Sequence, residues 1–214
     1  MNITFIAPPA AGKGTQSAKV SEKYGIPHIS TGDLLRNIQD ENLKQSLNQG
    51  NFASDELVTN LLEVRLQQKD CDKGYVLDGY PRNLGQAKIY EKLLKKLNKP
   101  MGIVIILDLD KEIAKQRIVG REICPNCGAV FNELLDPKAK VKGICDNCQH
   151  QLIKRNDDNE QTFEKRYQIY ENQTAPLIKY YEDKKIAYHV NSGINATYTF
   201  DQIQKIIGGL YDQH

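Results

Sequence analysis

The chain has 214 residues, of which 40% are hydrophobic and 26% charged, and its formal net charge is +2. This length allows one globular domain with inserted segments, and the near-neutral charge argues against a large surface for nucleic acid or membrane. No positively charged leader precedes the first apolar segment, and no apolar run approaches the roughly 18 residues of a membrane span. We therefore expect a cytoplasmic monomer without nucleic-acid or membrane partners.

Short apolar segments alternate with amphipathic segments along the chain. The apolar segments predict buried strands at 2–6, 26–29, 74–77, 103–107 and 186–190. The amphipathic segments predict helices at 13–24, 55–69, 85–97, 110–120, 160–183 and 199–211. Apolar strands separated by helices are typical of a parallel sheet covered on both faces. The sequence thus predicts an α/β fold with three layers, α/β/α, around five parallel strands whose carboxyl ends bind ligands.

Two stretches, 30–53 and 120–158, interrupt the alternation. The second contains several glycines and prolines and has no clear period. A segment of this length without a core of its own needs another source of order. We expect a core domain made of 1–29, 54–119 and 159–214, with the two stretches as inserts.

The segment Ala7–Thr15 (APPAAGKGT) lies between the first predicted strand and a helix. At this position backbone N–H groups and the helix N-terminus can bind phosphate oxygens, and Lys13 can add a mobile positive charge. Thr15 is a candidate for contacts on the metal side of a nucleotide. The segment departs from GxxxxGK[ST], because Ala7 replaces the first glycine and Gly14 the hydroxyl residue. On these residues alone, an ordinary strand–turn–helix connection with a surface lysine is the alternative.

Two CxxC pairs, Cys124-Pro-Asn-Cys127 and Cys145-Asp-Asn-Cys148, lie in the second insert. Such pairs are typical of a closed tetrahedral zinc site with four thiolate ligands, which is structural because no position is open to substrate. The metal would supply folding energy to a segment that lacks a core. Disulfides and four reduced cysteines are the alternatives, and iron could replace zinc. His150 is a competing ligand or an exposed histidine, and Cys71 is expected to be a plain buried or half-buried thiol.

Five further motifs follow in order: Ser30–Arg36 (STGDLLR), Leu77–Arg82 (LDGYPR), Arg117–Arg121 (RIVGR), Arg155–Asp158 (RNDD) with Arg166, and Thr174–Tyr181 (TAPLIKYY). Together with the phosphate loop they resemble the adenylate kinase family across nearly the whole chain. The resemblance implies reversible phosphoryl transfer from ATP to AMP, giving two ADP, with Mg²⁺ on ATP and a zinc-binding lid at 120–158. Several arginines suit this chemistry, because the guanidinium group pairs with phosphate oxygens and catalysis consists mostly of positioning and charge stabilisation.

The resemblance also implies the roles of individual residues. ATP would contact Ala10, Ala11, Gly12, Lys13, Gly14, Thr15, Arg117, Arg121, Val130, Phe131 and Asn195. AMP would contact Thr31, Arg36, Asn51, Phe52, Ala53, Gly79, Arg82, Gln86, Arg155 and Arg166. The catalytic set would be Lys13, Asp78, Arg82, Arg117, Arg121, Arg155, Asp157, Asp158 and Arg166. Asp78 would orient the magnesium shell through water, and Phe131 could equally belong to a small lid core.

Two alanines depart from the family pattern, in which positions 7 and 10 are usually glycine. If either position has positive φ, alanine costs on the order of 1 kcal/mol there. We expect both inserts to close over the substrates, with lid hinges near Gly120 and Asp158. The alternatives are a nucleoside monophosphate kinase with another donor or acceptor, and a nucleotide-binding protein that has lost catalysis.

Overall fold

The computed structural model describes residues 1–36, 54–155 and 158–211. Its centre is a five-stranded sheet in the order β2-β3-β1-β4-β7, and every neighbouring pair is parallel. The strands are β1 (Asn2–Ile6), β2 (His28–Ser30), β3 (Tyr75–Asp78), β4 (Ile103–Asp108) and β7 (Ala187–Asn191). The predicted sheet is confirmed, with no strand bound shifted by more than two residues.

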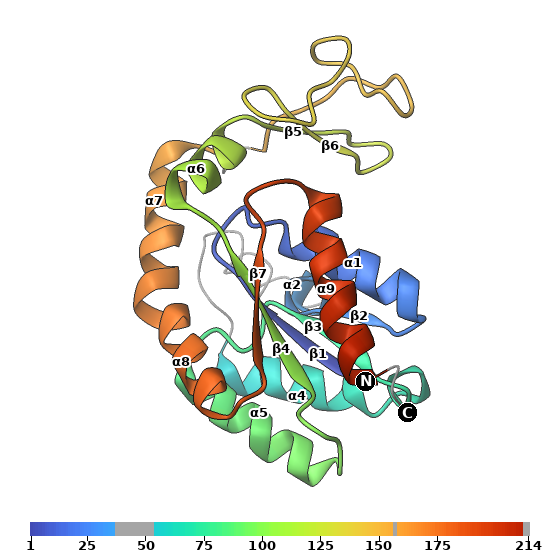
Figure 1. Cartoon of the computed structure of the whole chain (residues 1–214), viewed down its shortest axis with the longest axis vertical. Coiled ribbons are helices and arrows are strands. Elements are labelled where there is room, and N and C mark those ends of the chain that lie inside the picture. The colour runs from blue at the N-terminus through green and yellow to red at the C-terminus, as the bar shows by residue number, and fades with distance from the viewer. Residues whose placement is uncertain (37–53, 156–157, 212–214) are drawn as a thin grey trace.

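Helices cover both faces of this sheet (Figure 1). On one face, α1 (Lys13–Tyr24) and α9 (Ala196–Tyr211) pack against side chains such as Phe5 and Ile105. The other face is covered by α4 (Asp55–Leu66), α5 (Leu84–Lys96) and α8 (Ala175–Asp183). Successive residues of a strand point to opposite faces, so strands that are apolar throughout serve both layers. The predicted three-layer architecture is therefore confirmed.

The register brings the carboxyl ends of the strands to one edge of the sheet. Phe5 pairs with Asp78, and Asp108 pairs with Asn191. The connections at this edge lead into α1, α2 (Thr31–Arg36), α5, α6 (Lys111–Val119) and α9. Side chains that follow different strands can therefore meet there.

The helix predicted over 160–183 is not one regular α-helix. The structure has α7 (Glu160–Ile169), a π-helical segment (Tyr170–Thr174) and then α8. Pro176 explains the interruption, because it has no N–H to donate and its ring crowds the carbonyl four residues earlier. A wider π turn absorbs the ring without ending the helix.

Two other helix bounds differ from the prediction for local reasons. The first, α4, ends at Leu66 and is followed by a 3₁₀ turn, Lys69–Cys71. The second, α9, begins at Ala196 rather than 199, because the Asn195 side-chain oxygen accepts the N–H of Tyr198 at 2.8 Å and caps the helix.

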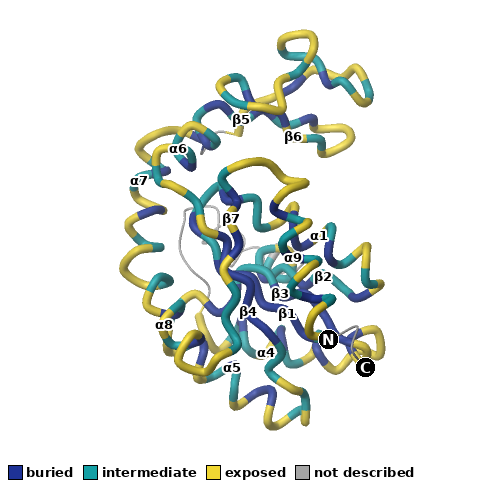
Figure 2. Tube along the Cα trace, viewed as in Figure 1, coloured by how far each residue is buried: buried dark blue, intermediate teal, exposed yellow. Residues whose placement is uncertain are grey.

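The segment 120–158 stands away from the sheet at the end of α6 and α7 (Figure 1). It contains an antiparallel pair, β5 (Arg121–Ile123) and β6 (Val130–Asn132), which the sequence did not predict. Its small core consists of Cys124, Phe131, Cys145 and Leu152. Figure 2 shows that buried residues concentrate in the sheet, whereas the outer loops of this segment are exposed. Among the described residues, no helix is long and apolar enough to cross a membrane.

Candidate active site

The phosphate loop presents an open helix N-terminus at the carboxyl end of β1. Gly12 has φ 79° and precedes α1, whose first turn receives no side-chain cap. The backbone N–H groups of the first turn of α1 and the positive end of its helix dipole are therefore available to bind an anion. Of the two unusual alanines, Ala10 has φ 63°, and Ala7 has no positive φ. The conformational cost foreseen for alanine thus falls on Ala10.

Asp78 is the last residue of β3, and its side chain contacts Lys13 of the phosphate loop and His28 of β2. One of its carboxylate oxygens lies 2.6 Å from Lys13 Nζ, and the other lies 3.4 Å from His28 Nε2. Burial favours the neutral acid, but the hydrogen bond from His28 and the charge of Lys13 outweigh it and lower the pKa of Asp78 to about 2. Asp78 is therefore a carboxylate at neutral pH and holds Lys13 over the end of β3.

The turn after β3 places Arg82 beside Gly79 and Thr31. The Arg82 Nε donates to the Gly79 carbonyl at 2.8 Å, and the buried Thr31 hydroxyl donates to the same oxygen at 3.1 Å. Gly79 has φ 85°, and a Cβ there would lie 2.9 Å from the Thr31 hydroxyl oxygen. Only glycine fits this turn without strain. The backbone itself is therefore part of the geometry that aims Arg82.

Gln86 supports the same turn. Its Oε1 accepts the backbone N–H of Arg82 at 2.7 Å, and its Nε2 donates to Asp55 Oδ1 at 2.7 Å. The side chain is thus engaged within the protein. The adenine contact that the family resemblance implies stays a prediction.

Two further arginines bear on this edge of the sheet. Burial lowers the pKa of Arg82, the charge of Asp78 opposes this shift, and the charge of Arg166 adds to it. Arg117 is half-buried, which lowers its pKa, and it donates to the carbonyls of Ser192 at 2.8 Å and Gly193 at 3.3 Å. Neighbouring cations repel each other, and a polyanionic ligand would relieve that repulsion. This edge of the sheet is suited to phosphate.

Arg121 and Asp158 form a two-pronged ion pair at the base of the segment 120–158. Arg121 Nε donates to Asp158 Oδ2 at 2.7 Å, and Nη2 donates to Oδ1. The Asp158 side chain is fully buried. Such bidentate pairs are geometrically specific as well as strong. The structure therefore pairs these two predicted site residues with each other.

Some predicted site residues make none of the contacts described above, and others lie outside the described residues. Arg155 is exposed, and its carbonyl accepts the N–H of Asp158 at 3.1 Å. Phe131 is 7% exposed and belongs to the small core of the insert, as the alternative had it, whereas Val130 is 49% exposed. Asn51, Phe52, Ala53, Asp157 and the side chain of Arg36 lie outside the described residues.

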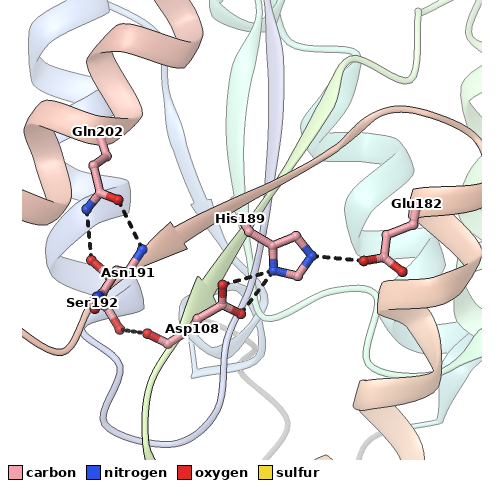
Figure 3. A network of polar contacts seen from close by, with 6 residues as sticks. All are labelled: Asp108, Glu182, His189, Asn191, Ser192 and Gln202. Atoms are coloured by element: carbon pink, nitrogen blue, oxygen red, sulfur yellow. Dashed lines mark hydrogen bonds and ion pairs between the residues drawn. The ribbon is translucent and has the colours of Figure 1, made fainter.

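The loop after β7 is fixed by polar contacts with β4 and α9 (Figure 3). Ser192 donates to the Asp108 carbonyl through both its hydroxyl and its N–H, at 2.9 Å each. Gln202 binds both backbone groups of Asn191. Gly193 and Ile194 of the same loop border an open groove of about 700 Å³. The loop is thus held beside the Arg117 guanidinium.

His189 lies between two carboxylates in the same network (Figure 3). Its Nδ1 is 2.9 Å from Asp108 Oδ2, and its Nε2 is 3.0 Å from Glu182 Oε1. Partial burial lowers the pKa of His189, but the hydrogen bonds to the two carboxylates prevail and raise it. A protonated imidazole donates from both nitrogens and thereby ties β7 to β4 and α8.

The four cysteines of the insert converge on one point, and their sulfur atoms all lie within 4.8 Å of one another. A tetrahedral zinc with bonds of about 2.3 Å places its sulfurs about 3.8 Å apart, and the Cys124–Cys148 and Cys127–Cys145 sulfurs are 3.3 and 3.5 Å apart. The donor set therefore fits zinc. His150 is exposed, and its ring nitrogen contacts the Cys148 carbonyl instead.

Each CxxC pair turns in the same way. The N–H of Gly128 bonds to the Cys124 carbonyl, and the N–H of Gln149 bonds to the Cys145 carbonyl. Both turning residues have positive φ, 73° and 62°. The backbone thus forms two equivalent knuckles around the sulfur cluster. The fifth cysteine, Cys71, is buried elsewhere beside Arg65, as expected.

Sequence reasoning missed two polar contacts of the site. His28 binds Asp78, and Ser192 fixes the loop after β7. Neither belongs to a recognisable spacing. The register between β2 and β3 brings His28 close to Asp78, and this register cannot be predicted from the sequence around either residue.

A parallel α/β sheet with a phosphate loop and arginine side chains at one edge defines a nucleotide-binding phosphotransferase. The family model described as adenylate kinase matches residues 5–186. An adenylate kinase of Geobacillus sp. (strain WCH70) is 40% identical over 98% of this chain and all of the relative. An adenylate kinase of Archaeoglobus fulgidus is 42% identical over 97% of this chain and 98% of the relative.

The chain belongs to the adenylate kinase family. It is an enzyme that transfers a phosphoryl group from ATP to AMP and yields two ADP. Enzymes of this family use Mg²⁺ with ATP, and the four-cysteine group is compatible with a structural zinc.

Proposed function

We propose that the chain maintains adenine nucleotide balance through a site in which cations from several strand ends hold both nucleotides. The observation that carries this proposal is that Lys13 and Arg82 both lie beside Gly79, at the end of β3, and that Lys13 pairs there with Asp78. Transfer between two nucleotides gathers many phosphate oxygens, and fixed cations stabilise the charge that develops. The attacking oxygen of AMP is already charged, so no general base is required.

On the donor side, the N–H groups of Ala10–Thr15 and the Lys13 ammonium would hold the ATP phosphates. Arg117 and Arg121 would add positive charge as the insert approaches. The base would lie along the loop Ser192–Asn195, whose carbonyls already meet the Arg117 guanidinium. Bound Mg²⁺ would neutralise charge on the donor phosphates, and the ionised Asp78 at this position would orient its shell through water.

On the acceptor side, Arg82 and Arg166 would bind the AMP phosphate, with Thr31 and Gly79 forming the turn that aims Arg82. Arg36, Gln86, the segment 51–53 and Arg155 would complete the contacts. Gln86 would exchange one of its present hydrogen bonds for the adenine edge. Asp157 and Asp158 would take up arginine partners as the insert closes, and Asp158 already pairs with Arg121.

The insert 120–158 would act as a lid, and 30–53 as the AMP-binding insert, on a core of 1–29, 54–119 and 159–214. Closure would exclude water, which otherwise competes with AMP for the phosphoryl group. The lid would turn near Gly120 and Asp158, where it leaves the core. Zinc on Cys124, Cys127, Cys145 and Cys148 would hold the lid folded without joining the reaction. We further propose a cytoplasmic monomer without a nucleic-acid partner, in keeping with the near-neutral charge.

The assay follows ADP production from ATP and AMP with Mg²⁺, using zinc-loaded protein. Lys13→Met removes the positive charge beside the donor phosphates and should lower kcat on the order of 100-fold or more. Lys23→Met, the same change at an exposed position of the same helix, is the control and should stay within about twofold. An unchanged rate for folded Lys13→Met would refute the donor site described here.

A further inference from the structure

The turn that carries Arg82 is anchored from a distant helix. The Thr174 hydroxyl donates to the Arg82 carbonyl at 3.0 Å, across 92 residues of sequence. Threonine hydroxyls within helices ordinarily bond to a carbonyl of the preceding turn. This one instead reaches another segment of the chain. The motif that begins at Thr174 therefore makes a long-range contact at the acceptor side of the site.

The π-helical segment places this hydroxyl. The N–H of Ala175 bonds to the Tyr170 carbonyl, five residues earlier, and Thr174 is the last residue of the widened turn. Pro176 follows directly and removes one N–H from the ladder. The extra residue in the turn rotates the positions around it relative to a regular helix. Thr174 thereby faces the turn after β3.

Three contacts fix Arg82, and each holds a different group. Its N–H is held by Gln86 at 2.7 Å, its Nε by the Gly79 carbonyl at 2.8 Å, and its carbonyl by Thr174. A guanidinium aims its donors at phosphate only if both its backbone and its side-chain stem are fixed. Thr174 supplies the restraint on the carbonyl.

We propose that Thr174 is a positioning residue that orients Arg82 toward the phosphate of the acceptor nucleotide. The inference rests on the role proposed above for Arg82. Loss of the hydroxyl lets the turn move, and the guanidinium then loses its alignment while the fold persists. The effect falls on the acceptor, because the hydroxyl of Thr174 binds the carbonyl of Arg82, which is proposed to hold the AMP phosphate.

The test compares Thr174→Val with Thr174→Ser in the ADP-forming assay. Valine keeps the shape and removes the hydroxyl, and we expect kcat/KM for AMP to fall about fivefold to tenfold. The KM for ATP should remain within about twofold. Serine keeps the hydroxyl and should restore kcat/KM for AMP to within about twofold of the unmodified chain. Thr197→Val, at an exposed position of α9, is the control for the substitution itself.

Arg82→Lys separates this inference from the proposal on which it rests. If Arg82→Lys leaves AMP kinetics unchanged, the role of Arg82 is wrong. If Arg82→Lys is impaired but folded Thr174→Val keeps full kcat/KM for AMP, the positioning role of Thr174 is wrong. Equal losses for Val and Ser, or equal losses toward ATP and AMP, also overturn it, because the hydroxyl would not then act on the acceptor side.

Discussion

Asp78 shows how the charge of one carboxylate can depend on two neighbouring side chains. Its side chain is 13% exposed and contacts Lys13 and His28. Although burial alone would raise the pKa of Asp78, these contacts lower it to about 2. A carboxyl group with a lowered folded-state pKa stabilises the protein above its unfolded pKa of about 3.9 and loses that contribution as the pH falls through the folded value.

We therefore predict that Asp78 contributes about 2 kcal/mol to the free energy of unfolding at pH 5 and almost nothing at pH 2. Urea denaturation of the unmodified chain and of Asp78→Asn across this range measures the difference. The gap between the two should close as the pH falls. The same substitution at the exposed Asp201 is the control. A gap that does not depend on pH would contradict the assignment.

Ala10 has a left-handed backbone conformation, which is strained for any residue with a Cβ atom. Its φ is 63°, and its methyl group packs against the cluster of Ala114, Ile118, Phe163 and Tyr167. A glycine there would relieve on the order of 1 kcal/mol of strain but would lose the packing of one methyl group, about 0.8 kcal/mol. The two effects nearly cancel, which explains how alanine is tolerated.

A β-branched side chain should not be tolerated at this position. We predict that Ala10→Val lowers the free energy of unfolding by about 1–3 kcal/mol, because branching at Cβ conflicts with positive φ. Ala10→Gly should remain within about 1 kcal/mol of the unmodified chain. Chemical denaturation measures both variants, and wild-type stability for Ala10→Val would exclude a left-handed backbone at Ala10.

At the scale of elements, Gly120 is needed where α6 passes into β5. A Cβ on Gly120 would lie 2.3 Å from Asn132 Oδ1. That side chain cannot move cheaply, because it binds the Arg117 carbonyl and the N–H groups of Leu134 and Leu135. Close packing rather than positive φ is therefore the reason for glycine here.

We predict that Gly120→Ala destabilises the protein by about 1–3 kcal/mol through this overlap. Gly209→Ala is the matched control, because Gly209 lies in α9 with no atom within 4 Å of the added Cβ. The control should gain about 0.5–1 kcal/mol, since alanine favours a helix over glycine. Thermal denaturation of the two variants should show opposite shifts, and a loss for both would disprove the packing argument.

The regular elements were largely predictable, and the exceptions have identifiable causes. Continuous apolar strands marked the sheet, because each strand is buried on both faces. The π-helical segment Tyr170–Thr174 was not predicted, because the apolar pattern of 160–183 continues through it. Only the position of Pro176 indicated that the helix could not stay regular there. The pair β5 and β6 was missed because three-residue strands are too short for a period to appear.

At the scale of the whole molecule, the segment proposed as the lid and the core have separate sources of stability. Buried residues of the core cover both faces of five strands, whereas the lid core contains two cysteines with Phe131 and Leu152. So small a cluster does not fold a segment by itself. The sulfur cluster would supply the missing free energy once a metal is bound.

We predict that removal of the metal unfolds the lid and leaves the core intact. Cys145→Ser should lose bound zinc, and backbone amides of 121–153 should lose hydrogen-exchange protection while those of β1 and β4 keep theirs. Cys71→Ser changes a buried cysteine outside the four-cysteine cluster, and this variant should still bind zinc at the cluster. Elemental analysis with hydrogen exchange reports both outcomes, and a protected lid in metal-free protein would disprove the dependence.

The candidate active site contains some residues that the sequence predicts and others that only the structure reveals. Residues within motifs, such as Lys13, Arg82 and Arg117, could be predicted as site residues because their local spacing carries the resemblance. The supporting residues His28, Ser192 and Thr174 make contacts across 50 to 92 positions of sequence. Their roles depend on the register and on the π turn, which only the folded chain defines.

The ion pair between Arg121 and Asp158 also bears on how such chains diversify. Arg121 and Asp158 lie near the two ends of the segment 120–158, and their ion pair holds those ends together. We therefore expect that changes within this segment leave the sheet intact. A graft of the segment from a relative should keep its junction with the core when it retains Arg121 and Asp158.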